Sequence, residues 1–93
     1  MTRRLLRSSA FVRAARQVVR KDPRLAEDIR AALELLAEDA FHPQLQTHKL
    51  KGKLRGSWAC SAGYDLRIVF EVLDYEGSEA VLLETVGTHD EVY

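Results

Sequence analysis

The sequence predicts an α+β fold, in which an N-terminal helical hairpin packs on one face of a small antiparallel sheet. Two observations favour it. Apolar residues recur with a helical period in the first half of the chain, and from Ser57 onward they alternate with a period of two. Because helices and strands occupy separate halves, the helices are expected to gather on one face of the sheet. The 93 residues allow one domain, 1–93.

The N-terminal half is expected to form two short amphipathic helices. The segment Arg3–Arg7 could first form an edge strand, and Ser8 and Ser9 are good N-cap residues. Asp22-Pro23 is expected to start the second helix, since Asp caps a helix and Pro suits its first position. Two apolar stripes have helical spacing: Phe11, Val12, Ala15, Val18 and Val19, then Leu25, Ile29, Ala32, Leu33 and Leu36.

Three strands are expected in the second half of the chain. Apolar residues alternate over Trp58–Ala62 and Leu66–Leu73, and a hairpin loop containing Gly77 leads to a mostly apolar strand, Glu79–Val86. The two helices can cover only one face of this sheet. The other face, which carries Arg67, is therefore expected to be open to a ligand.

Composition narrows the classes of function. With Cys60 as the single cysteine, no internal disulfide can form, so a reducing, cytoplasmic location is expected. No apolar run approaches the roughly 18 residues of a membrane span. The basic, acid-free first 21 residues also fit a mitochondrial transit peptide, but so small a core needs the strand and helix they would form. No metal or other cofactor is expected, because the three histidines lie in separate loops without ligand spacing.

Charge is unevenly distributed along a chain of zero net charge. Residues 1–58 carry thirteen Lys and Arg against six Asp and Glu, a net of +7, and residues 59–93 carry one Arg against eight acids, a net of −7. A basic half can attract a polyanion locally, but a solvated helix surface beside an acidic edge would give the same pattern. The uneven distribution of charge is therefore compatible with a nucleic-acid partner but does not establish one.

Two segments carry residue types suited to chemistry on a phosphodiester. Segment 47–56 holds His48, four cations and two glycines that would let a backbone approach a phosphate closely. The C-terminal segment 87–93 holds His89 and ends in an aromatic residue, Tyr93. The alternatives are a solvated basic loop in the first case and an inert surface histidine on an exposed tail in the second.

Taken together, these motifs resemble those of RelE/StbE-type toxins, close to the YafQ type. The likeness rests on His48-Lys49-Leu50-x-Gly52, Trp58, the segment Tyr64–Phe70 and the ending Gly87–Tyr93, and it extends over nearly the whole chain. It implies a RelE-like fold and the toxin of a type II toxin–antitoxin system, which cleaves messenger RNA in the ribosomal A site without a metal. The resemblance implies that the partners are an antitoxin encoded nearby and the ribosome with its message. Operator DNA would be bound only through the antitoxin complex, and no association with a membrane is expected.

The resemblance also implies roles for individual residues. The candidate catalytic residues are His48, Asp65, Arg67, His89 and Tyr93, and the candidate phosphate-binding residues are Lys49, Lys51, Lys53 and Arg55. Either histidine can serve as base, with His89 or Asp65 as acid, and Tyr93 would stack on a base or donate a proton. One position departs from the family: Thr85 stands where YafQ-like toxins have an arginine, and Arg67 could supply the lost charge.

Two other functions are compatible with the same fold. ParE-like toxins are understood to inhibit DNA gyrase and lack the C-terminal histidine, so the pair His48 and His89 favours the nuclease. The second alternative is a toxin that has lost its activity and persists as an antitoxin-binding protein or co-repressor. Thr85 and the zero net charge favour that alternative somewhat.

Overall fold

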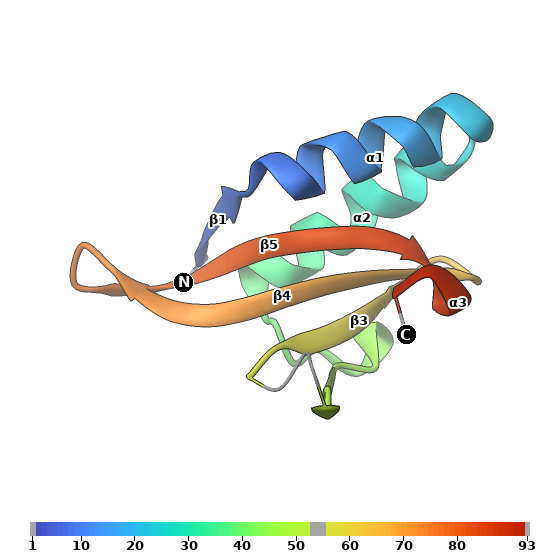
Figure 1. Ribbon diagram of the computed structural model, residues 1–93. Coiled ribbons are helices and arrows are strands. Elements are labelled where there is room, and N and C mark those ends of the chain that lie inside the picture. The colour runs from blue at the N-terminus through green and yellow to red at the C-terminus, as the bar shows by residue number, and fades with distance from the viewer. Residues whose placement is uncertain (1, 53–55, 93) are drawn as a thin grey trace.

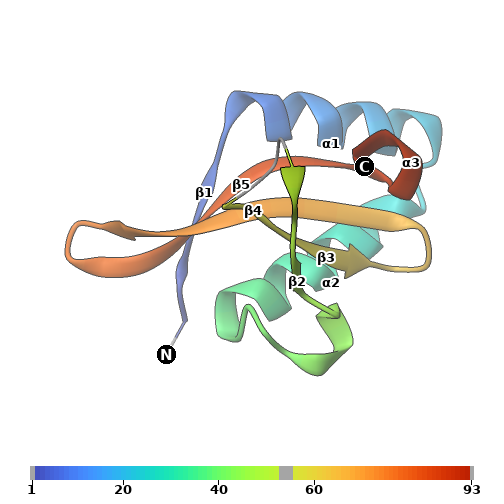
Figure 2. The same ribbon diagram turned by 60° about the horizontal axis from the view of Figure 1, so that its bottom comes forward.

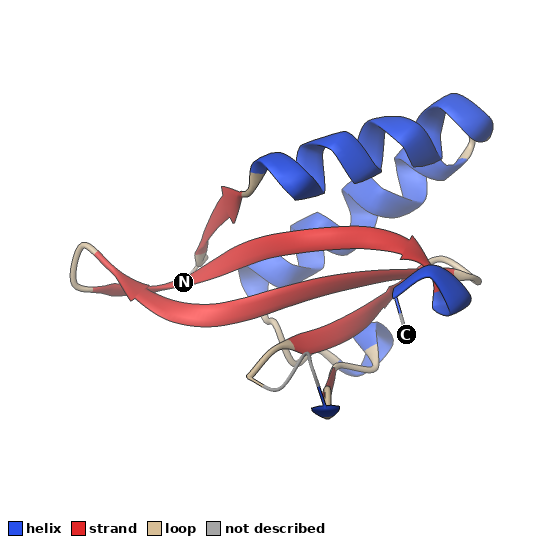
Figure 3. Cartoon of the chain, in the orientation of Figure 1, coloured by secondary structure: helices blue, strands red, loops and turns tan. Residues whose placement is uncertain are grey.

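The computed structural model describes residues 2–52 and 56–92, which form a sheet of five strands with two long helices against it (Figure 1). The elements in chain order are β1 (Arg4–Arg7), α1 (Ser9–Lys21), α2 (Leu25–Glu38), the 3-10 helix η1 (Pro43–Leu45), β2 (His48–Lys49), β3 (Trp58–Ala62), β4 (Leu66–Tyr75), β5 (Ser78–Thr88) and α3 (His89–Val92). Figure 3 shows the helices and strands of the predicted α+β fold. The two long helices come from the first half of the chain and the long strands from the second.

The strands follow the order β1-β5-β4-β3-β2 across the sheet. Strands β3, β4 and β5 form the predicted antiparallel meander. Strand β1 adds to β5 in parallel, with Arg4 beside Ala80 and Arg7 beside Leu83, so the sheet is mixed and not wholly antiparallel as predicted. The residue pattern of a four-residue edge strand contains no information on its direction, because parallel and antiparallel strands share the same alternation.

The start of the first helix agrees with the prediction, and the start of the second does not. Ser8 caps α1, since its hydroxyl oxygen accepts a hydrogen bond from Phe11 N at 3.0 Å. Helix α2 begins at Leu25 and not at Asp22-Pro23. The Asp22 carboxylate instead accepts a hydrogen bond from the backbone N–H of Arg24 at 3.1 Å, so this pair makes the turn between the helices.

The main core lies between the helices and the sheet. Its largest fully buried side chains include Phe70, Leu36, Ile68 and Leu83, which come from α2, β4 and β5. Cys60 belongs to this core, and burial raises the pKa of its thiol to about 12. The thiol is therefore neutral and unreactive, and Cys60 is a small packing residue of the sheet.

The opposite face of the sheet, here called the outer face, is only partly open. Leu50, Ala59 and Val69 form a second buried apolar cluster, and Val92 packs against it. Leu50 follows β2 and Val92 lies in α3, so two segments distant in sequence cover part of the outer face. The sequence predicts an open face there, because a single apolar residue in a loop or a tail gives no sign that it is buried.

A bulge between β4 and β5 sets an acidic residue apart from the ladder. Val69 pairs with Thr85 and Phe70 with Leu83, which leaves Glu84 without a partner across the strands. The buried Ser57 hydroxyl donates to the Glu84 carboxylate, at 2.9 Å from Oε1 and 3.1 Å from Oε2. Burial raises the pKa of Glu84, and the nearby Glu71 carboxyl raises it further, while the Ser57 hydrogen bond acts in the opposite direction.

The raised pKa of Glu84 makes stability fall as the pH rises. The ordinary pKa of a glutamate is 4.5, and in the folded chain the Glu84 carboxyl still keeps its proton at pH values just above this pKa. At those pH values the folded state therefore binds more protons than the unfolded state. Glu84→Gln keeps an acceptor for Ser57 and removes the ionisation. We expect the free energy of unfolding in urea to increase at pH 7. The increase should be less than about 1 kcal/mol, because water screens the half-exposed carboxyls of Glu84 and Glu71. No increase is expected at pH 4.

A matched control is Glu76→Gln, which changes an exposed glutamate of the β4–β5 loop that pairs with Arg4 at 3.4 Å. This variant should gain no stability at either pH. An equal increase for Glu84→Gln at pH 4 and pH 7 would contradict the explanation by ionisation.

Candidate functional site

The sheet register places His48 on the outer face. His48 pairs with Ala59, Ala59 with Val69, and Val69 with Thr85, so the four residues form one row across β2, β3, β4 and β5. Paired residues of neighbouring strands project from the same face of a sheet. Since Ala59 and Val69 belong to the cluster on the outer face, the exposed His48 side chain projects from that face too.

The C-terminal segment folds over the same face as the short helix α3. Thr88 and Glu91 form a capping box, in which the Glu91 carboxylate accepts from Thr88 N at 2.8 Å and Glu91 N donates to Thr88 Oγ1 at 3.3 Å. The hydrogen bond from the Thr88 backbone is the main reason why the pKa of Glu91 is lowered. The exposed tail that the sequence predicts is therefore a helix, and the Thr-x-x-Glu pattern is the signal that could have revealed it.

Gly87 allows α3 to lie close to strand β5. A Cβ atom at this position would stand 3.1 Å from Glu91 Oε1, 3.2 Å from Glu91 Cβ and 3.4 Å from Val92 Cγ1. The two separations from Glu91 are tighter than ordinary van der Waals contact, so any larger residue would press on the helix. Gly87 is thus a positioning residue for His89, which begins α3.

The segment of His48 and the segment of His89 converge on the outer cluster of Leu50, Ala59, Val69 and Val92. Leu50 lies two residues after His48, and Val92 lies three residues after His89. Both side chains contact the same cluster, so the sheet edge at β2 and the tail helix are joined across β3 and β4. Figure 2 shows β2 crossing in front of the sheet and α3 at the far end of β5.

The hydrogen bond of His48 specifies its tautomer. His48 Nδ1 lies 3.1 Å from the backbone carbonyl oxygen of Gln46, which can only accept. Nδ1 therefore carries the proton in the neutral ring, and the lone pair resides on Nε2. Gln46 adopts a left-handed conformation, with φ of 51°, and this turn brings its carbonyl to the ring. At the other histidine, His89 Nδ1 lies 3.6 Å from Asp90 Oδ1, an ion pair when His89 is protonated.

Asp65 lies at the same end of the sheet as His89. Leu66 pairs with Thr88, so Asp65 and His89 each stand one residue beyond this pair. Asp65 is exposed in the turn that precedes β4 and does not belong to the strand itself. A carboxylate and an imidazole are therefore brought to one corner of the sheet.

Arg67 lies on the outer face beside this corner. It pairs with Gly87 on one side and with Ser61 on the other. Its side chain is half-buried, and its guanidinium donates to the backbone carbonyl of Leu66 at 2.9 Å and, at the long distance of 3.5 Å, to that of Tyr64. The same cation that would contact a phosphate also ties the β3–β4 turn to the strand.

The lysine next to His48 lies on the other face of the sheet. Lys49 pairs with Trp58, whose side chain packs against the main core, so Lys49 projects from the face opposite to His48. Lys51 is exposed in the loop that follows β2. Lys53, Arg55 and Tyr93 lie outside the described residues. His42 is a turn residue, because its Nδ1 accepts a hydrogen bond from Gln44 N at 3.1 Å and caps η1.

Comparisons with known proteins identify the family. The profile of the YafQ toxin family, described as bacterial toxins of type II toxin-antitoxin systems, matches residues 3–93. A comparison with curated protein sequences gave no match. No helix of residues 2–52 and 56–92 is long and apolar enough to cross a membrane.

Several solved toxin structures share the fold. YafQ from Escherichia coli has a TM-score of 0.78 at 15% identity over 98% of each chain. YafQ in the DinJ-YafQ toxin-antitoxin complex of Escherichia coli has a TM-score of 0.76 at 16% identity, over 100% of this chain and 99% of that one. A YoeB/ParE toxin from Agrobacterium tumefaciens has a TM-score of 0.75 at 19% identity, over 92% and 98%. Because the family profile spans almost the whole sequence, the chain belongs to the YafQ family of bacterial type II toxin–antitoxin toxins.

Proposed function

We propose that this toxin is a metal-independent endoribonuclease that cuts messenger RNA in the ribosomal A site. The observation that carries the proposal is the cluster of Leu50, Ala59, Val69 and Val92, which joins the segments of His48 and His89 on one face of the sheet. RNA contains its own nucleophile, the 2′-hydroxyl. Two groups that move protons, together with cations for the phosphate, therefore suffice for the reaction.

The tautomer of His48 favours it as the general base. Its Nε2 lone pair would take the proton from the 2′-hydroxyl as O2′ attacks phosphorus. The bond from phosphorus to O5′ breaks, and the protonated imidazole of His89 gives its proton to O5′. The products are a 2′,3′-cyclic phosphate and a new 5′-hydroxyl. Asp65, at the same corner as His89, would stabilise the imidazolium or supply the proton itself.

Arg67 is the proposed cation for the non-bridging oxygens of the phosphate. Thr85, in the row of His48, provides a hydroxyl where related toxins have a guanidinium, so the row lacks a positive charge of its own. Arg67 emerges from the next position of the outer face along β4. Lys51, and from the undescribed part of the loop Lys53 and Arg55, would hold neighbouring phosphates. Tyr93 would stack on an unpaired base.

The proposed partners follow from the family. The toxin would bind an antitoxin encoded nearby, as YafQ does in the DinJ-YafQ complex, and would contact operator DNA only through that complex. Its substrate would be a ribosome-bound message in the cytoplasm. Antitoxin segments of this kind often fold on binding, so a small protein that co-purifies with the toxin is expected.

A non-catalytic role is the second candidate, and Thr85 is the observation that favours it. A toxin without the arginine of its relatives could persist as an antitoxin-binding protein or a co-repressor. Induced expression separates the two candidates, because a catalytically inactive toxin leaves cells growing. Gyrase-dependent DNA damage with intact messages would instead indicate a ParE-like activity.

Removing either histidine should abolish message cleavage. We expect His48→Ala and His89→Ala each to lower the cleavage rate by about 10²- to 10⁴-fold, the usual contribution of a proton-transfer group. The measurement is induced expression followed by mapping of message ends. The matched control is His42→Ala, which removes the third histidine of the chain from a helix cap and should leave the cleavage pattern intact. Wild-type cleavage by His89→Ala would remove this residue from the mechanism.

Cleavage should depend on the ribosome. Proton transfer accounts for only part of an enzyme's acceleration, and much of the rest comes from holding the 2′-oxygen in line with the leaving group. We expect the ribosome to provide that alignment, so a free RNA oligonucleotide should be cut very slowly. Incubation of the purified toxin with the same message, with and without ribosomes, measures the difference. Rapid cleavage of the naked RNA would contradict the expectation.

A larger residue at Gly87 should displace the tail helix. Gly87→Val would push Glu91 and Val92 away from β5 and move His89 from the corner that it shares with Asp65. We expect at least about a tenfold loss of cleavage, since small misplacements of catalytic groups are costly. Gly87→Ala needs a shift of only a few tenths of an ångström and should lose less.

Thermal unfolding distinguishes displacement of the tail from loss of the fold. The main core does not include α3, so the midpoint of Gly87→Val should remain close to that of the wild type. Full cleavage by this variant would show that the position of α3 is irrelevant to the reaction.

A further inference from the structure

An aromatic side chain that is firmly held yet half exposed lies at the β2–β3 edge. The Phe41 side chain belongs to the turn between α2 and η1, and the residue is 48% exposed. Its backbone N–H donates to Asp39 Oδ1 at 3.0 Å, and the N–H of His42 donates to the Asp39 carbonyl at 3.0 Å. Thr47 Oγ1 donates to the Ala40 carbonyl at 2.6 Å on the other side of the turn. The ring is therefore presented to solvent by a backbone with little freedom.

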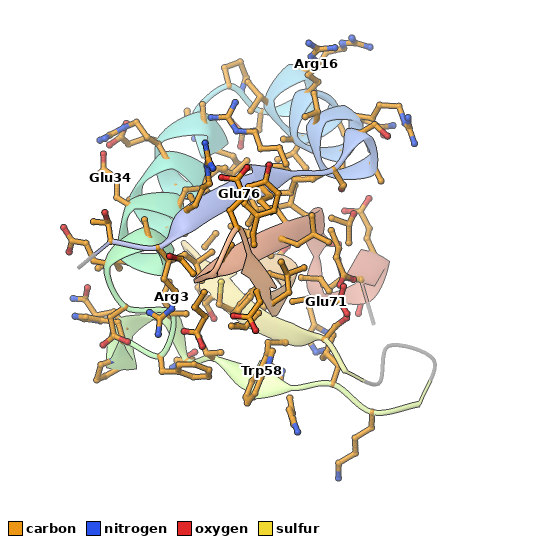
Figure 4. The ribbon with its side chains drawn as sticks, turned by 90° about the vertical axis from the view of Figure 1, so that its left-hand side faces the viewer. Arg3, Arg16, Glu34, Trp58, Glu71 and Glu76 are labelled. Carbon is orange, nitrogen blue, oxygen red and sulfur yellow. The ribbon has the colours of Figure 1, made fainter. Side chains whose placement is uncertain are left out.

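Trp58 and Lys49 complete this surface, which we call the aromatic platform. The rings of Phe41 and Trp58 meet edge to face, with centroids 5.0 Å apart and planes at 82°. Lys49 Nζ lies 5.5 Å from the centroid of the Trp58 ring. Figure 4 shows Trp58 at the opposite side of the molecule from Arg16 of α1, so the platform is separate from the basic surface of that helix.

Aromatic rings beside a lysine are the groups that hold unpaired nucleotides. Every base has a π-face that can stack on an aromatic ring, and the adjacent phosphate is attracted to the cation. Lys49 and Lys51 are both exposed at this edge. Their charge attracts an anionic partner. The rings favour a nucleic acid over an acidic peptide, because every base offers a flat face, whereas a peptide offers one only at an aromatic residue.

The platform and the candidate site lie on either side of one edge strand. Successive residues of a strand project from opposite faces, so His48 and Lys49 point to different sides of β2. Strand β2 is at the edge of the sheet, and no further strand of the described residues lies beyond it. An RNA strand with a phosphodiester at His48 can therefore turn around this edge and bring an adjacent base to the platform.

We propose that Phe41, Trp58 and Lys49 form a stacking subsite for an unpaired RNA base next to the bond that is cut. The inference rests on the proposed nuclease function, to which it adds a contact outside the reacting groups. Stacking at this subsite would fix the direction in which the RNA chain passes His48. It would tolerate any base and would favour purines, whose larger rings stack more strongly.

The single tryptophan of the chain provides a direct readout, because the fluorescence of Trp58 reports on the platform alone. The probe is a single-stranded RNA of about ten nucleotides, within the range that such surfaces bind. Its 2′-hydroxyls are methylated, so that it has no nucleophile and cannot be cut. Titration of the full-length toxin with this RNA should quench the fluorescence in a saturable way.

Phe41→Leu is the decisive variant. Leucine keeps the apolar contact with Trp58 but has no π-face, and we expect it to lower the affinity for the RNA by about 5- to 140-fold, the range for loss of one stacked base. Thermal unfolding shows whether the variant is folded. Lys49→Met should reduce the salt dependence of binding, since it removes one phosphate contact.

The matched control is Tyr75→Ala. Tyr75 is 39% exposed and also lies beside a cation, with Arg4 5.3 Å from its ring centroid, but it belongs to the distant β4–β5 hairpin. Its removal should leave the RNA affinity within about twofold of the wild type.

The outcomes separate the subsite from the nuclease function. If messages are cut but Phe41→Leu binds the RNA and cuts like the wild type, the subsite is refuted and the nuclease function stands. If no message is cut but the RNA quenches the Trp58 fluorescence and this quenching depends on Phe41, the subsite stands and the nuclease function fails. A quench by the antitoxin and none by the RNA would refute the subsite, because it would assign the platform to a protein.

Discussion

The contact of Leu50, Ala59, Val69 and Val92 on the outer face joins the two segments that carry the histidines of the proposed reaction. The first segment follows strand β2 at the edge of the sheet, and the second is the helix α3, which is far from it in the sequence. Burial of one aliphatic side chain stabilises a fold by only about 1.5–3 kcal/mol, so this small cluster contributes much less free energy of folding than the main core. Substitutions in the cluster should therefore disturb the candidate site before they disturb the fold.

The fold could be predicted from the sequence wherever a residue pattern is long enough to have a period. Both long helices and the three strands of the meander follow from apolar spacing, and the Ser8 cap follows from its residue type. Three of the features that were not predicted show why the sequence was insufficient. The four residues of β1 do not indicate that the strand runs parallel to β5. The pair Asp22-Pro23 is as compatible with a turn as with the start of a helix. Helix α3 depends on a capping box and is too short to show a helical period of apolar residues.

The candidate site could be predicted as a set of residues but not as an arrangement. Resemblance to a family selects His48, Asp65, Arg67 and His89, yet it does not say which side of an edge strand a residue occupies. That depends on register, and one step along β2 separates His48 from Lys49 by the whole thickness of the sheet. The tautomer of His48 depends likewise on a backbone carbonyl, at Gln46, that no residue pattern reveals.

The pairing of β1 with β5 has a consequence for the synthesis of the protein. These strands come from opposite ends of the sequence, and α1 also packs on β5. Contacts of such long sequence separation form late, since the intervening chain must first be closed into a loop. A nascent chain therefore emerges with its first strand and first helix unable to dock, and the sheet is completed only after translation has reached the last strand.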